Sequence, residues 1–258
     1  MGKPHVNYAL EPKPMGIGGQ AEVFRAHDKR TNQLVAFKRL LPNLRMDQDA
    51  IARMRREIDV QSVIKHPNIM PILDYSEHHY WYTMPLAEKS LMDMTTPIEY
   101  LQILQIIDDI ASGLEFAHQL GNIHRDITPR NILELKSSDN KTRWVISDWG
   151  LVRRIGLTSV VRTSPGFQYG TEGFAAPESG LDAHMVDARA DVYSLGRVVA
   201  WCVSGNWPLQ NIPLCPDGPL QDFILKTTKL YPHERVGNMN EVLKIIERLK
   251  NTSIEKEY

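Results

Sequence analysis

The sequence has few cysteines and no long apolar run, and both absences narrow the class of protein. Its 258 residues include only two cysteines, Cys202 and Cys215. Two cysteines do not make a disulfide framework, and no cysteine–histidine cluster has the spacing of a zinc site. No apolar stretch is long enough to cross a bilayer, and residues 1–10 lack the apolar core of a signal peptide. We therefore expect a cytoplasmic protein without a membrane segment.

An excess of charge of one sign is also missing. The chain carries 30 Lys and Arg against 31 Asp and Glu, a formal net charge of −1. This balance gives no support to a nucleic-acid partner, which would call for a basic surface. The length and the 42% hydrophobic content are ordinary for a globular protein, and they suit one large domain or two lobes around a cleft.

The pattern of the first third of the chain is mostly that of β-strands. Apolar runs at 23–26 and 34–37 flank a polar turn at 28–33 and predict two strands. A helix is predicted from 47 to 64, where an aspartate precedes apolar residues at helical spacing. Short strands are expected again over 69–84.

The pattern of the rest of the chain is mainly helical. Apolar residues recur at helical spacing over 98–120, and further helices are predicted over 191–203 and 239–249. The change of character predicts two lobes, an N-terminal one over residues 1–86 and a C-terminal one over residues 87–258.

An acid, an amide and two cations lie within the eight residues His124–Asn131. Phosphoryl transfer from a metal-bound nucleotide uses such groups: a carboxylate orients a hydroxyl, an amide oxygen holds a metal, and cations offset charge. Asp126 is the candidate carboxylate, and Asn131 is the candidate metal ligand. Taken alone, the stretch is also consistent with an ordinary capped loop.

Three further residues occur in the order that this chemistry requires. Lys38 ends a predicted strand, Glu57 lies on the following predicted helix, and Asp148 follows an apolar run. Each has an ordinary structural explanation: a strand-end lysine, a solvated helix charge and an Asx turn. Their joint occurrence favours phosphate binding at Lys38, an ion pair between Lys38 and Glu57, and magnesium binding at Asp148.

Glycines lie between two strand signals near the N-terminus, in the segment Gly16-Ile17-Gly18-Gly19-Gln20-Ala21. Glycine lets backbone N–H groups approach phosphate oxygens closely. A glycine turn is by itself more typical of a simple hairpin, so this segment only adds to the other signals.

Together these motifs resemble the signature of the protein kinases. The motifs that carry the resemblance are the glycine segment with Ala21 in place of its third glycine, Val35-Ala36-Phe37-Lys38, Glu57, His124-Arg125-Asp126 with Asn131, Asp148-Trp149-Gly150, Ala176-Pro177-Glu178, His66-Pro67-Asn68-Ile69, Asp191–Gly196 and Arg235. The resemblance covers nearly the whole chain and is greatest to bacterial Ser/Thr kinases of eukaryotic type. It implies an α+β bilobal fold, with an antiparallel sheet and one helix in the N-terminal lobe and a mainly helical C-terminal lobe.

The resemblance also implies a set of site residues and the cofactors ATP and Mg²⁺ (or Mn²⁺). The implied catalytic residues are Asp126, Lys38, Glu57, Arg130 and Thr171. The implied ATP-binding residues are Gly16, Ile17, Gly18, Gly19, Val23, Ala36, Lys38, Met84, Leu86 and Ala87. The implied metal ligands are Asn131 and Asp148.

The chain departs from the family pattern beside the catalytic aspartate. Thr128 occupies the position at which Ser/Thr kinases usually carry a lysine, and Arg130 occupies the position of the substitute arginine of tyrosine kinases. The segment Thr171–Glu178 resembles the Ser/Thr form, in which a threonine contacts the catalytic aspartate. We therefore expect a Ser/Thr kinase, with a tyrosine or dual-specificity kinase as the alternative.

Two further departures leave a second alternative open. Trp149 replaces a phenylalanine, and Gln61 stands where a leucine or methionine is usual; a buried glutamine needs a hydrogen-bond partner. These residues are consistent with a pseudokinase that serves as an interaction module. A small-molecule phosphotransferase is a third reading, but the Thr171–Glu178 segment is typical of a platform for a polypeptide.

The resemblance predicts ATP-dependent transfer of the γ-phosphate to Ser/Thr hydroxyls of protein substrates, including the chain itself. Asp148–Glu178 would be the activation segment, in which Thr163 and Ser164 are the candidate phosphorylation sites and Arg125 is the candidate partner of the phosphate. A serine- and threonine-rich loop that is never modified is equally consistent with this stretch. The sequence does not specify an oligomeric state.

Overall fold

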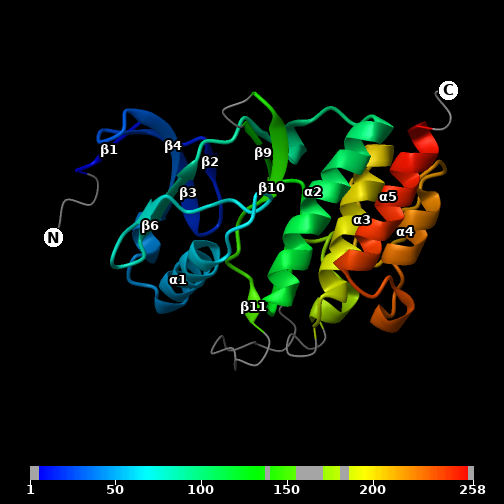
Figure 1. Cartoon of the computed structure of the whole chain (residues 1–258). Coiled ribbons are helices and arrows are strands. Elements are labelled where there is room, and N and C mark those ends of the chain that lie inside the picture. Colours follow the sequence, from blue (N-terminus) through cyan, green and yellow to red (C-terminus); the bar gives the residue numbers. More distant parts are fainter. Residues whose placement is uncertain (1–5, 137–139, 155–170, 181–185, 255–258) are drawn as a thin grey trace.

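The computed structural model describes residues 6–136, 140–154, 171–180 and 186–254. The strands of the N-terminal sheet and α1 form one end of the molecule, α2 to α5 form the other, and β9 and β10 lie between them (Figure 1). The strands are β1 (Tyr8–Leu10), β2 (Gly16–Ile17), β3 (Ala21–Asp28), β4 (Gln33–Leu40), β5 (Asp74–Tyr75), β6 (Trp81–Pro85), β7 (Lys89–Ser90), β8 (Asn122–Ile123), β9 (Ile132–Lys136), β10 (Thr142–Ile146) and β11 (Arg153–Arg154). The α-helices are α1 (Gln48–Val63), α2 (Tyr100–Gln119), α3 (Arg189–Ser204), α4 (Gln221–Thr227) and α5 (Met239–Ile254).

The N-terminal sheet is antiparallel and follows the order β1-β3-β4-β6-β5, with β2 paired to β3. The register places Lys38 between Val23 on β3 and Tyr82 on β6, and it places Ala36 beside Met84. Residues directly opposite each other on paired strands share a face of the sheet. The register therefore gathers four of the predicted ATP-binding residues along β3, β4 and β6.

Helix α1 begins where the sequence predicts. The Asp47 carboxylate accepts hydrogen bonds from the backbone amides of Asp49 and Ala50, and so caps the first turn. The helix buries a stripe that includes Met54, Glu57 and Ile58. Glu57 is therefore not a solvated helix charge, and the ordinary explanation of that residue is wrong.

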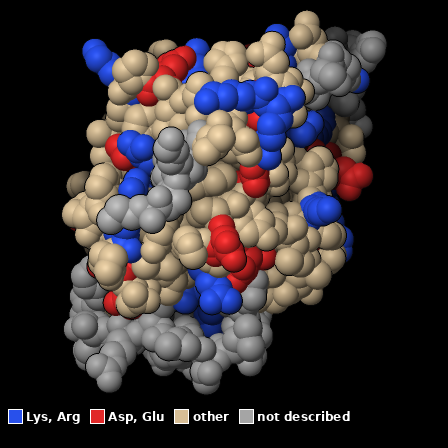
Figure 2. Space-filling view, turned by 90° about the vertical axis from the view of Figure 1, so that its left-hand side faces the viewer, with Lys and Arg blue, Asp and Glu red and all other residues tan. Residues whose placement is uncertain are grey.

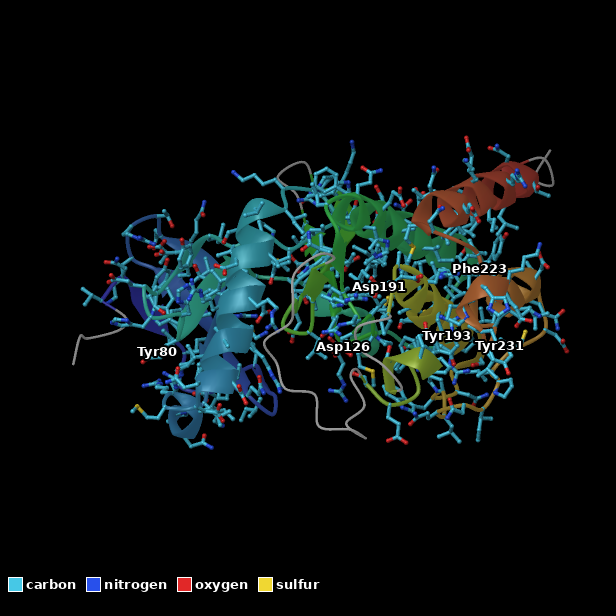
Figure 3. The ribbon with its side chains drawn as sticks, turned by 90° about the horizontal axis from the view of Figure 1, so that it is seen from below. Tyr80, Asp126, Asp191, Tyr193, Phe223 and Tyr231 are labelled. Carbon is cyan, nitrogen blue, oxygen red and sulfur yellow. The ribbon has the colours of Figure 1, made fainter. Side chains whose placement is uncertain are left out.

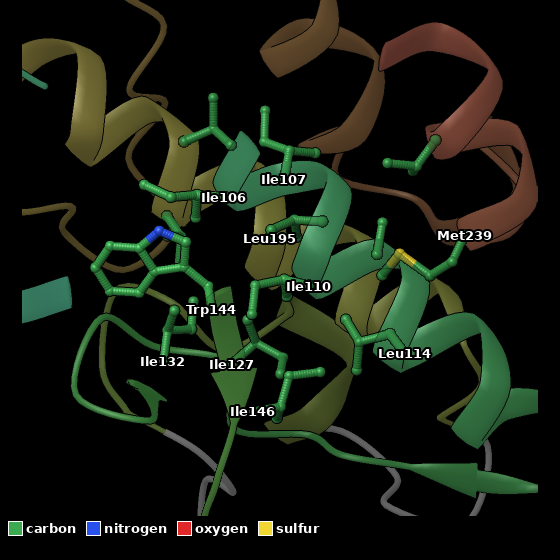
Figure 4. Close-up of a cluster of buried hydrophobic side chains, with 14 of the residues drawn as sticks. Ile106, Ile107, Ile110, Leu114, Ile127, Ile132, Trp144, Ile146, Leu195 and Met239 are labelled. Carbon is green, nitrogen blue, oxygen red and sulfur yellow. The ribbon is translucent and has the colours of Figure 1, made fainter. Parts of the chain in front are cut away.

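The C-terminal part is built around α2. Its apolar residues at helical spacing pack against α3, α5 and the β10 strand in one continuous core (Figure 4). The side chains labelled there are Ile106, Ile107, Ile110, Leu114, Ile127, Ile132, Trp144, Ile146, Leu195 and Met239. Each fully buried aliphatic side chain contributes roughly 1.5–3 kcal/mol relative to exposure. Ile127 and Ile132 belong to this core, so it anchors the segment between β8 and β9.

The sequence analysis predicted the fold class correctly but missed several short elements. The strands β7 and β9 and helix α4 were not predicted, whereas the short strand expected just before Asp148 is the end of β10. The short strands expected over 69–84 are β5 and β6, and β6 extends to Pro85. A lobe boundary between residues 86 and 87 stays a prediction. Within the described part of the chain, no helix has the length and apolar character that crossing a membrane requires.

Candidate active site

A cavity of about 780 Å³ is lined by residues of the N-terminal sheet, of α1 and of the segments that flank β9 and β10. All ten predicted ATP-binding residues line it. Glu57, Asp126, Arg130, Asn131 and Asp148 line it as well. Residues far apart in the sequence thus meet at one concave site.

The glycine segment forms one wall of this cavity. The Gly18 amide donates a hydrogen bond to the Ala21 carbonyl oxygen at 2.8 Å, which closes the turn between β2 and β3. A Cβ atom added at Gly16 or Gly19 would meet nothing within 4 Å. The wall therefore leaves open space where a ligand could approach the backbone closely.

Lys38 is held by two carboxylates at the back of the cavity. Its Nζ atom donates to both Glu57 carboxylate oxygens, at 2.8 and 3.0 Å, and lies 3.2 Å from Asp148 Oδ2. The Tyr82 hydroxyl donates to Glu57 Oε1 at 2.7 Å. Sequence reasoning did not identify Tyr82, although its position opposite Lys38 follows from pairing β4 with β6.

The three charged groups differ in pKa because their surroundings differ. Burial would lower the pKa of Lys38, but the charges of Asp148 and Glu57 outweigh burial and raise it well above its ordinary value. Burial raises the pKa of Glu57 to about 7 against the opposing charge of Lys38. Burial also acts to raise the pKa of Asp148, yet the charge and hydrogen bond of Lys38 lower it. Asp148 is accordingly an anion and Lys38 a cation at neutral pH.

Asp126 is fixed by two neighbours on the other side of the cavity. Its Oδ1 atom accepts from the backbone amide and the hydroxyl of Thr171, both at 2.9 Å. Its Oδ2 atom accepts from the Asn131 amide nitrogen at 3.1 Å. Burial raises the pKa of Asp126, the charge of His124 opposes this rise, and Asp148 adds to it. The Asp126 carboxylate is thus held in a fixed orientation, and its raised pKa makes it a better proton acceptor.

The backbone before Asp126 is held by a buried aspartate of α3. Asp191 accepts from the backbone amides of His124 and Arg125, at 2.9 and 2.8 Å, and shares a 2.7 Å hydrogen bond with His118. Arg125 has a φ of 69°, a conformation that such fixed hydrogen bonds help to maintain. Asp126 and Asp191, the latter on the first turn of α3, lie near each other in the middle of the molecule (Figure 3). Asp191 therefore positions the segment that carries Asp126.

Comparison with known proteins agrees with this geometry. Residues 10–214 match the family model described as the protein kinase domain. The chain belongs to the protein kinase domain family. It is 34% identical over 214 residues to the serine/threonine-protein kinase PknJ of Mycobacterium tuberculosis, an alignment that covers 80% of this chain and 35% of that protein. It is 32% identical to PknB of Mycolicibacterium smegmatis, over 75% of this chain and 32% of that protein.

A solved structure of another protein has the same fold. The crystal structure of the Mycobacterium tuberculosis PknI kinase domain superposes with a TM-score of 0.70 and 22% identity, and covers 95% of this chain and 97% of that chain. This likeness shows the bilobal kinase fold. The chain spans about a third of the length of the curated relatives it matches.

Two residues beside Asp126 have different surroundings in this kinase domain. Thr128 is buried, so its side chain does not replace a lysine at the cavity. Arg130 is exposed and lines the cavity. The pKa of Asp93 is lowered mainly by its hydrogen bonds with Ser90 and to a smaller extent by the charge of Arg130. Arg130 is therefore the cation of this segment that is placed to meet a ligand.

Gln61 and Trp149 are both buried in the kinase domain. Gln61 finds the partner that burial requires: its amide nitrogen donates to the Met70 carbonyl oxygen at 2.8 Å. Trp149 packs edge-on against His124, with ring centroids 4.6 Å apart. Gln61 Oε1 and Trp149 Nε1 have no hydrogen-bond partner among the described residues.

The far end of the predicted activation segment is anchored by an ion pair. Arg235 donates two hydrogen bonds to the Glu178 carboxylate, at 2.6 and 2.7 Å. Arg125 donates from Nε to the Leu151 carbonyl oxygen at 2.8 Å. The candidate phosphorylation sites Thr163 and Ser164 lie outside the described residues.

The two predicted metal ligands fit a magnesium ion. The Asn131 amide nitrogen donates to Asp126, which directs the amide oxygen elsewhere. The Asp148 side chain is 46% exposed and faces the cavity. No group of three or more His, Cys, Asp or Glu residues suited to a metal occurs in the described ranges. Mg²⁺ is commonly held by one or two protein ligands together with waters and substrate phosphates, so Asn131 and Asp148 suit it.

Proposed function

We propose that the chain is an active protein serine/threonine kinase, which transfers the γ-phosphoryl group of ATP to Ser or Thr hydroxyls of protein substrates, including its own chain. Bound ATP, with Mg²⁺ or Mn²⁺, supplies the phosphoryl group. The family membership, the named relatives and the cavity support this proposal. The two isolated cysteines also favour a cytoplasmic location.

The residues on the nucleotide side of the cavity have different roles in this reaction. Lys38 binds phosphate oxygens, and Glu57 keeps its ammonium group in place. Asn131 and Asp148 would hold the metal, and the amides of the glycine segment would bind the phosphates. The sheet residues around Ala36 and Met84 would contact the base.

The acceptor side of the reaction depends on Asp126. Its carboxylate orients the Ser or Thr hydroxyl and accepts the proton as the new oxygen–phosphorus bond forms and ADP leaves. Arg130 offsets negative charge on the transferred group in place of the absent lysine. Thr171 holds Asp126 in the orientation that this step needs.

The observation that carries the proposal is the pair of hydrogen bonds from Thr171 to Asp126. They join the segment before Ala176-Pro177-Glu178 to the carboxylate that would meet the acceptor. Such a link couples the presentation of a polypeptide to the reacting group. It is what a protein acceptor requires, and a small acceptor does not need it.

The test is to identify the acceptor atom directly. The purified protein is incubated with labelled ATP and magnesium, alone and with a mixed Ser, Thr and Tyr peptide library, and the sites are mapped by mass spectrometry. The proposal predicts label on Ser and Thr only. Label on Tyr alone would favour the tyrosine alternative. Absence of transfer, with ATP binding retained, would favour a pseudokinase.

A further inference from the structure

A buried arginine ties a surface loop to the segment that holds Asp126. Arg197 on α3 is 1% exposed. Its guanidinium group donates to the carbonyl oxygens of Gly173, Leu209 and Ile212, at 2.9, 2.7 and 2.9 Å. Gly173 follows Thr171 by two residues, whereas Leu209 and Ile212 belong to the loop between α3 and α4.

The same two segments also touch directly. Gly173 has a φ of 87°, and a Cβ atom there would lie 1.9 Å from the Pro208 carbonyl oxygen. The Phe174 ring packs edge-on against Trp207, with centroids 5.0 Å apart. Because Arg197 and this packing join them, the loop and the Thr171 segment form one rigid unit.

The exposed part of this loop is uncharged and carries three large apolar side chains beside two asparagines, Asn206 and Asn211. Trp207, Leu209 and Ile212 are 40%, 58% and 55% exposed. Residues 198–216 contain no Lys, Arg, His, Asp or Glu. Apolar side chains that remain exposed on a fixed loop are typical of a contact surface for an apolar partner group. We call Trp207, Leu209 and Ile212 the loop surface.

The distance along the chain places the loop surface within reach of an acceptor peptide. Trp207 packs on Phe174, three residues after Thr171, and Thr171 contacts Asp126. Three residues span at most about 10 Å of chain. A polypeptide whose hydroxyl lies at Asp126 would therefore bring residues a few positions away to Trp207.

We propose that the loop surface binds an apolar side chain of the protein acceptor, two to five residues from the phosphorylated hydroxyl, and that Arg197 is the positioning residue that fixes this surface to Thr171. This inference rests on the proposed function. The occupant is the acceptor polypeptide, because the surface continues directly from the residues that hold Asp126. Because the loop carries no charged residue, it suits an apolar side chain of the acceptor and offers no ion-pair partner to a charged one.

The test uses serine peptides in which leucine or glutamine is placed in turn at each of the five positions on either side of the serine. The wild type should prefer leucine at one or more positions from two to five by about tenfold in kcat/KM, the effect of one well-packed apolar contact. Trp207→Ala should abolish the preference for leucine over glutamine, measured as the ratio of the two kcat/KM values, and should leave the KM for ATP unchanged. Leu73→Ala, which truncates a leucine of similar exposure on the sheet side, should keep the preference.

Arg197→Met adds a test of the positioning role, with Arg197→Lys as the conservative variant. Arg197→Met should raise the KM for the leucine peptide but not that for ATP, and Arg197→Lys should restore part of the loss. Calorimetric titration of the leucine and glutamine peptides into the protein measures binding without turnover. Absence of phosphoryl transfer by the wild type would refute the proposed function. A preference for leucine that persists in Trp207→Ala, in binding or in transfer, would overturn the proposal that the loop surface binds an apolar side chain of the acceptor.

Discussion

At the scale of single residues, Lys38 keeps its charge because two carboxylates face it. The two differ in how far they are exposed to solvent. Asp148 is partly exposed and remains an anion, so it stabilises the ammonium group even when Glu57 carries a proton. Glu57 is buried and bonded to Tyr82 as well as to Lys38. The position of Glu57 along the sequence predicted the ion pair, but only the fold shows that the pair is buried and that Tyr82 completes it.

The first prediction concerns the titration of Glu57. Because burial raises its pKa to about 7, the folded state holds the proton more tightly than the unfolded state. The contribution of this group to stability is therefore present below its ordinary value of 4.5 and is lost as the pH rises through about 7. Carbon-13 NMR of the glutamate carboxyls in the nucleotide-free protein should show one midpoint close to 7, and Glu57→Gln should remove it. A Glu57 midpoint near 4.5 would contradict this account.

The second prediction concerns the cation beside Asp126. Arg130 lines the cavity whereas Thr128 is buried, so Arg130→Ala should lower kcat by roughly 10²-fold, as the loss of one charge-stabilising donor does elsewhere. Arg130→Lys should restore part of the rate, because it returns the charge without the fork of donors. Arg55→Ala, on the exposed face of α1, is the matched control and should leave kcat unchanged. Unaltered transfer by Arg130→Ala would show that the missing lysine is replaced in another way.

At the scale of elements, α3 connects the active site to the helical core. Its first turn supplies Asp191, which holds the backbone of His124 and Arg125, and its middle supplies Arg197. The helix itself was predictable from its apolar pattern. The roles of these two side chains were not predictable, because their hydrogen-bond partners lie more than ten residues away in the sequence and only the fold brings them together.

The third prediction concerns Asp191. Burial would raise its pKa, but the hydrogen bond and charge of His118, together with the charge of His124 and the Arg125 amide, outweigh burial and lower it. Its stabilising contribution is therefore present above the ordinary value of 3.8 and is lost as the pH falls through the lower value of the folded state. Asp191→Asn places an amide group against backbone N–H donors and should reduce the free energy of unfolding by about 2–4 kcal/mol.

Urea unfolding followed at several pH values checks this prediction. The difference between wild type and Asp191→Asn should narrow as the solution becomes strongly acidic and the Asp191 carboxylate takes up a proton. Asp187→Asn, at a partly exposed aspartate just before α3, serves as the control and should cost much less. A difference that does not narrow in strong acid would contradict this account.

At the scale of the whole molecule, the kinase domain places its functional groups where the sheet meets the helical part. The strand and helix patterns predicted the two lobes and the order of the long elements, and the resemblance to the protein kinases predicted the fold class and ten ATP-binding residues that line the cavity. The strand β9 was missed because its five residues lack a clear alternation, and α4 was missed because seven residues are too few for helical spacing to stand out. The charged side chains on the described part of the face in Figure 2 are mixed in sign, in keeping with the balanced composition.

An enzyme and a module that only binds a nucleotide would need different groups in the cavity. In an enzyme, Lys38 and Asp148 from one side of the cavity and Asp126 from the other must act on a single bound nucleotide. In a binding module, the groups on the nucleotide side alone would suffice. The hydrogen bonds from Thr171 and Asn131 fix the Asp126 carboxylate, as the acceptor side of an enzyme would require.

The most direct test of an active kinase is a single-turnover measurement with saturating magnesium ATP and a serine peptide, on the wild type and on Asp126→Asn. The variant keeps the size of the side chain but removes the proton acceptor. We predict that γ-phosphate transfer slows by roughly 10²–10⁴-fold in Asp126→Asn, while the affinity for ATP measured by calorimetry stays within a factor of about two. Equal rates of transfer in the two proteins, or no transfer in the wild type, would contradict the assignment of Asp126 as the residue that activates the acceptor.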